Sequence, residues 1–85
     1  MNFLTSKKLV QIFTEIAGQK MCHGAKEAPK LLLQAFESME GAIDDSTMQH
    51  IYSQFCIKLN DKPGWGYKQL ASMLSSILEE QMNVG

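Results

Sequence analysis

Four side chains of this 85-residue sequence carry the atoms that zinc prefers as ligands: Cys22, His23, His50 and Cys56. Cys22 and His23 are adjacent, so their side chains diverge in most backbone conformations. His50 and Cys56 are six residues apart and fall on different faces of a helix, whereas metal-binding pairs on helices are three or four residues apart. The spacing therefore argues against a metal site, and we expect no metal and no cofactor.

The sequence also offers few groups for catalysis. A nucleophilic Cys22 would need an imidazole within hydrogen-bond reach and a group that stabilises charge, and the spacing indicates neither. Glu79 and Glu80 are neighbours that point apart on a helix, so they do not form an acid/base pair. Gly64-Trp65-Gly66 lacks the Lys-[Ser/Thr] end of a Walker loop and the third glycine of a dinucleotide loop. We predict that the protein is not an enzyme.

The basic residues argue against nucleic acid as the partner. All eight are lysines, the acids number nine, and the formal net charge is −1. Proteins that bind nucleic acids rely on arginine for bidentate contacts to guanine and for phosphate contacts. The charge is nevertheless uneven, because residues 1–30 carry +3 and residues 31–85 carry −4. A DNA- or RNA-binding regulator that uses the lysine-bearing helix faces remains the alternative hypothesis; its candidate residues are Lys7, Lys8, Lys26, Lys30 and Lys68.

The distribution of apolar residues predicts no membrane segment. A transmembrane helix needs about 18 or more consecutive apolar residues, and the longest runs here are trios such as Leu31-Leu32-Leu33. Lys7 and Lys8 are not followed by the apolar block of a signal peptide. Two cysteines could form at most one disulfide, which favours reduced thiols. We therefore expect a cytoplasmic protein.

Apolar residues recur along the sequence at about 100° per residue, which is the period of an α-helix. Helices must therefore position the candidate residues named above. Four helices are predicted, at about 6–18, 26–40, 45–59 and 65–82. Thr5 or Ser6 is the expected N-cap of the first helix. Pro29 suits the first turn of the second helix, and Gly41 suits its end. Asp44 or Asp45 is the expected N-cap of the third.

Each predicted helix has an apolar stripe. Four amphipathic helices with short connections predict one all-α domain, a compact four-helix bundle or four-helix array. The stripes along the four helices consist of Leu9, Val10, Phe13, Ile16 and Ala17; Ala28, Leu31, Leu32, Ala35, Phe36 and Met39; Met48, Ile51, Tyr52, Phe55, Cys56 and Leu59; and Leu70, Ala71, Met73, Leu74, Ile77, Leu78 and Met82.

A few residues do not fit the interior of a bundle. Leu33 lies about 130° from the centre of its stripe at 100° per residue, and Ile57 points almost opposite Leu59. His50 shares the outer face with Ile57. Met73 is at the edge of a wide apolar arc. Trp65 is expected to pack on the bundle end, as a lone tryptophan in a small domain usually does, and the alternative is that it anchors an interface.

These residues motivate the functional hypothesis. We predict a small non-catalytic protein that acts by protein–protein binding, as a regulator, inhibitor or adaptor, and a homodimer is one form that this binding could take. The candidate partner-binding residues are Leu33, His50, Ile57, Trp65 and Met73. At least two of the apolar ones should be exposed in the monomer and buried on self-association or partner binding. A small metal-binding or enzymatic protein is the third hypothesis.

Overall fold

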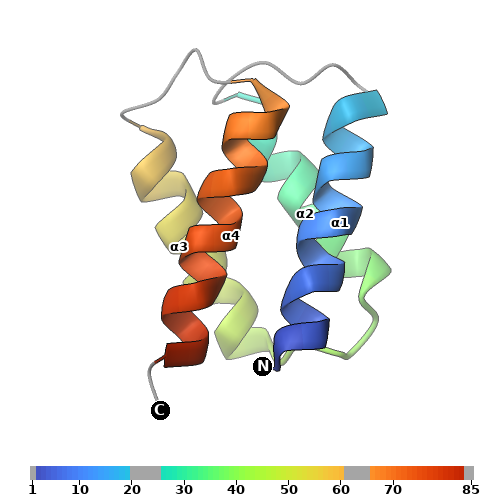
Figure 1. Cartoon of the computed structure of the whole chain (residues 1–85), viewed down its shortest axis with the longest axis vertical. Helices are drawn as coiled ribbons and strands as arrows, with labels where there is room; N and C mark the ends of the chain where they lie inside the picture. Colours follow the sequence, from blue (N-terminus) through green and yellow to red (C-terminus); the bar gives the residue numbers. More distant parts are fainter. Residues whose placement is uncertain (1, 20–25, 61–65, 84–85) are drawn as a thin grey trace.

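Four antiparallel helices make up the computed structural model, which describes residues 2–19, 26–60 and 66–83. The chain runs up, down, up and down, so that both ends of the described chain lie at the same end of the bundle (Figure 1). This arrangement confirms the predicted all-α fold of four helices. The helices are α1 (Phe3–Gln19), α2 (Ala28–Ser38), α3 (Asp45–Leu59) and α4 (Tyr67–Asn83).

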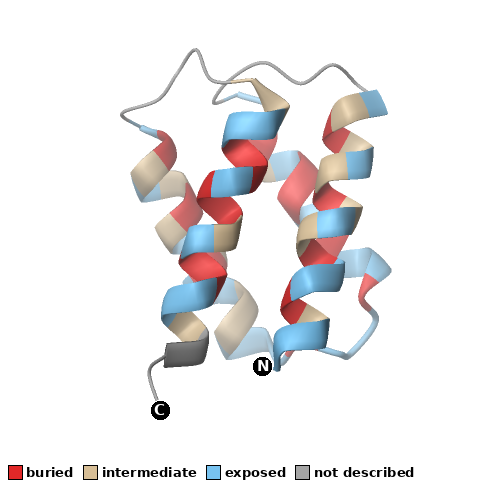
Figure 2. Ribbon diagram, viewed as in Figure 1, coloured by how far each residue is buried: buried red, intermediate tan, exposed pale blue. Residues whose placement is uncertain are grey.

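The helices form a closed ring in which each packs on two neighbours. α1 packs against α2 and α4, and α3 packs against the same two helices. Buried residues therefore line the inward sides of all four helices, and exposed residues cover the outside (Figure 2). Phe13 of α1 and Phe55 of α3 meet across the ring, edge to face, with 5.7 Å between ring centroids. This pair ties together two helices that are diagonal in the bundle.

α1 begins earlier than predicted. Its first residue is Phe3, and the side chain of Asn2 accepts a 2.8 Å hydrogen bond from the backbone N–H of Thr5. Asn2 is therefore the cap, because asparagine offers the same capping geometry as serine or threonine. The prediction of Thr5 or Ser6 as N-cap is wrong, and Ser6 is instead buried on the inner face.

α2 is shorter than predicted at both ends. It begins at Ala28, with Pro29 in its first turn as expected, and its last residue is Ser38. Glu40 and Gly41 then adopt positive φ angles of 32° and 77°. Gly41 carries this left-handed conformation without strain, because it has no Cβ. The helix therefore ends before the predicted stop, with Met39 as its C-cap, and Gly41 lies in the turn that leads toward α3.

Side chains cap the two following helices. Asp44 is the N-cap of α3, as predicted, and accepts hydrogen bonds from the backbone N–H and the hydroxyl of Thr47 at 3.2 Å and 2.6 Å. At the start of α4, the Gln69 side chain accepts a 3.2 Å hydrogen bond from the Gly66 N–H. Both contacts satisfy backbone donors that a helix terminus leaves open.

The buried residues of α4 cover a wider arc of the helix surface than a single apolar stripe would. Ala71 and Met73 lie on its two edges, and both are buried, with Met73 only 8% exposed. The reason is that α4 packs against α1 on one side and α3 on the other. The prediction that Met73 belongs to the surface is therefore wrong. None of the described helices is long and apolar enough to cross a membrane.

Candidate functional site

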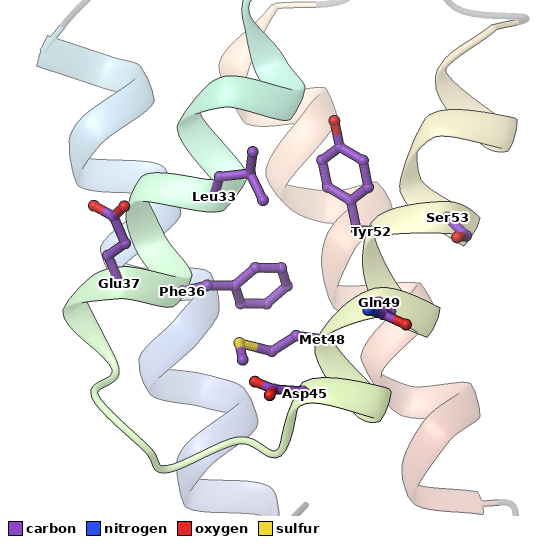
Figure 3. Close-up of a pocket in the computed structure, with 8 residues that line it drawn as sticks. All are labelled: Leu33, Phe36, Glu37, Asp45, Met48, Gln49, Tyr52 and Ser53. Carbon is purple, nitrogen blue, oxygen red and sulfur yellow. The ribbon is translucent and has the colours of Figure 1, made fainter.

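A groove of about 610 Å³ lies between α2 and α3 (Figure 3). Apolar and aromatic side chains from both helices point toward one another in it: Leu33 and Phe36 from α2, and Met48 and Tyr52 from α3. Phe36 is also part of the core, whereas Met48 and Tyr52 are half-buried and pack on its edge. The groove is thus an opening in the bundle surface through which core-facing side chains are reached.

The groove lies between the neighbouring helices that share the least extensive contact, α2 and α3. α2 has only 11 residues, and its apolar stripe faces α1 and the interior. Leu33 lies outside this stripe, on the side of α2 that faces the gap. It is 48% exposed, so neither the core nor α3 covers it.

Polar residues surround the apolar floor. Asp45, the first residue of α3, places its carboxylate at the end of the groove where the two helices are connected, whereas Glu37, near the end of α2, lies on the rim with its carboxylate on the side of α2 away from Phe36 (Figure 3). Gln49 and Ser53 line the α3 side. All four are exposed. The site therefore combines an apolar strip with an acidic end, which suits a ligand that is apolar along one part and cationic along another.

Tyr52 is the titratable group most affected by this environment. Desolvation by burial, and secondly the neighbouring Cys56 thiol one helical turn away, raise the pKa of its hydroxyl above the ordinary value of 10.0. A phenol is neutral at physiological pH even at its ordinary pKa, so the Tyr52 hydroxyl can donate a hydrogen bond to a ligand in the groove. Cys56 is a free, half-buried thiol.

The structure separates the two apolar residues that the sequence placed outside the core. Leu33 and Ile57 are both exposed, as predicted, with 62% of Ile57 accessible. Only Leu33 lines the groove. Ile57 lies about 140° around α3 from Tyr52, at 100° per residue, and shares the outer face with exposed His50. Trp65 lies outside the described residues.

Several exposed residues were missed by reasoning from the sequence. Phe3 and Leu4, in the first turn of α1, are 65% and 74% exposed. Asn2 was the signal that could have found them, because this residue is as good an N-cap as Thr5 or Ser6. The groove residues Glu37 and Asp45 carried no such signal, because the periodicity of one helix does not give its distance from the next.

The described residues contain no group of three or more His, Cys, Asp or Glu side chains that could hold a metal ion. Cys22 and His23 lie outside the described ranges. The lysines proposed for nucleic-acid binding are divided between the two ends of the bundle. Lys7 and Lys8 lie near the start of α1, whereas Lys26, Lys30 and Lys68 lie near the starts of the antiparallel α2 and α4, at the opposite end.

Comparison of the chain with known protein families, with curated proteins and with solved structures finds no significant match. The geometry and chemistry of the α2–α3 groove resemble those of a binding site. Its volume falls in the range of about 300–1,000 Å³ that is typical of ligand sites.

Proposed function

We propose that this chain is a non-catalytic protein-binding domain, a small regulator, inhibitor or adaptor, and that the α2–α3 groove is its binding site. The observation that carries the proposal is the strip of Leu33, Phe36, Met48 and Tyr52, accessible between two helices and flanked by polar residues. Binding surfaces in proteins commonly combine an apolar centre with a polar rim. Methionine and tyrosine in the strip favour adaptable contacts with a partner.

The shape and charge of the groove favour an amphipathic helix as ligand. A helix that lies in a groove between two helices presents apolar anchors at intervals of three and four residues. Leu33 and Phe36 provide an apolar contact on α2 with the same spacing. The carboxylates of Asp45 at one end and of Glu37 on the rim favour a lysine or arginine beside the apolar anchors.

The groove can be tested with a synthetic amphipathic helix of leucine and lysine as the probe. In a methyl NMR titration, the resonances of Leu33 and Met48 should shift first, because these side chains line the groove. Leu33→Glu should weaken binding about tenfold or more, because it places an unpaired carboxylate against the apolar strip. Leu33 is half-exposed, so this variant should retain the thermal stability of the parent chain.

Ile57→Glu is the matched control, because it makes the same change at an exposed apolar residue outside the groove. It should leave the titration unchanged. Shifts centred on Ile57, or binding that is insensitive to Leu33→Glu, would contradict the proposed site. The same pair of variants, used as baits in affinity capture from the native cell, should separate groove-bound partners from incidental ones.

A further inference from the structure

The exposed face at the start of α1 complements the groove, because it carries apolar and basic side chains whereas the groove carries apolar and acidic ones. Phe3 and Leu4 are largely exposed, and Lys7 and Lys8 follow them one helical turn later, also exposed. At 100° per residue these four residues lie within about 140° of one another, on the side of α1 away from buried Leu9 and Phe13. The start of α1 is therefore an apolar turn followed by a cationic turn on one solvent-facing side.

We propose that a second copy of this chain occupies the groove, with the start of its α1 lying along the gap between α2 and α3. This assignment rests on the proposed function, because it names the occupant of the same groove. Phe3 and Leu4 of one copy would cover the apolar strip of the other, and Lys7 and Lys8 would reach Glu37 and Asp45. The net charge of the sequence is divided in the same way: residues 1–30, which include the two lysines, carry +3, and residues 31–85, which include the two acids, carry −4.

The order of apolar and charged residues along the groove and along the start of α1 allows one orientation of the docked helix. In the groove, the Asp45 carboxylate lies at the end where α2 joins α3, Glu37 lies on the outer side of α2, and Tyr52 lies farther along (Figure 3). In α1, the apolar residues precede the lysines by one turn, about 5.4 Å. The docked α1 must therefore point its lysines toward the α2–α3 connection, so that both kinds of contact form together.

The position of Glu37 in its helix is a further electrostatic reason to expect a lysine of a second copy beside it. This acid lies in the last turn of α2, where no basic residue is present and where the helix dipole is negative. A cation is the favoured neighbour at such a position. A lysine from a second copy would supply it. Each copy has both a groove and an α1 start, and these lie on different sides of the bundle, so the contact is head to tail and each copy can bind a further copy at each surface.

The test is the concentration dependence of the mass of the full chain, measured by sedimentation equilibrium. The mean mass should rise above that of a single chain as the concentration increases, and the association should weaken with salt. Leu4→Glu and Leu33→Glu should each weaken it about tenfold or more. The decisive experiment mixes two charge-reversed chains. Lys7→Glu/Lys8→Glu and Glu37→Lys should each associate poorly alone and should recover association when mixed.

Two variants that reverse other exposed charges serve as controls. Lys68→Glu and Glu80→Lys reverse exposed charges elsewhere and should leave self-association unchanged. A chain that is monomeric at all concentrations, or charge-reversed chains that do not rescue one another, would overturn the proposal. If the leucine–lysine probe still binds the groove of that monomer, the proposed function stands and only the second copy is excluded. If neither binds, both proposals fail.

Discussion

At the scale of single residues, Asp44 connects the sequence to the stability of α3. Its carboxylate accepts hydrogen bonds from the Thr47 hydroxyl, from the Ser46 hydroxyl at 2.9 Å and from the Thr47 N–H. These bonds, led by that of the Thr47 hydroxyl, lower the pKa of Asp44 below its ordinary value of 3.8. The charged form is thus favoured in the folded state, and its contribution to stability is present above pH 3.8 and is lost as the pH falls through the lowered pKa.

Asp44→Asn should reveal this contribution, because asparagine caps a helix about as well as aspartate but does not titrate. The melting temperature of the variant should be lower than that of the parent chain at pH 6, and the difference should vanish as the pH falls below 3.8 toward 2. Thermal denaturation followed by circular dichroism at several pH values measures it. A difference that stays constant from pH 6 to pH 2 would show that the charge of Asp44 has no role.

At the scale of helices, the same chemical change should have opposite effects at two glycines. Gly18 lies within α1, and a Cβ added there would meet the Tyr67 ring at 3.4 Å, an ordinary contact distance. Gly18→Ala should therefore raise the free energy of unfolding by about 0.5 kcal/mol, since alanine favours helix. Gly41 has a φ of +77°, so Gly41→Ala should lower it by about 1 kcal/mol. Urea denaturation of both variants measures the two signs, and equal signs would contradict the explanation.

The helices were largely predictable from the sequence because each is specified by local signals. The apolar stripe of α2 is buried in full, as predicted, and Asp44 and Gly41 mark the boundaries on either side of the α2–α3 connection. Errors arose where two residues offered equivalent signals, as Asn2 and Ser6 did for the cap of α1. The groove could not be predicted, because its existence depends on the separation of α2 and α3. Met73 was assigned wrongly for the same reason: periodicity gives the direction of a side chain, and the neighbouring helices decide whether it is covered.

At the scale of the whole molecule, the ring of helices is joined across its centre by Phe13 and Phe55. Both side chains are fully buried, and their rings meet at 71° with centroids 5.7 Å apart. An edge-to-face pair in this geometry contributes about 0.5–1.5 kcal/mol beyond the burial of its area. Because the pair links the diagonal helices α1 and α3, it should couple the two halves of the bundle.

A double-mutant cycle with Phe13→Leu and Phe55→Leu should isolate this coupling. Each single change should lower the free energy of unfolding, and the double variant should lose less than the sum of the two losses by about 0.5–1.5 kcal/mol. Phe3→Leu is the control partner for Phe13→Leu, because Phe3 is exposed on the same helix and should combine additively. Chemical denaturation supplies all of these free energies. Additive losses for Phe13 and Phe55 would mean that the two rings only fill space, and the coupling across the bundle would then have to come from the aliphatic residues around them.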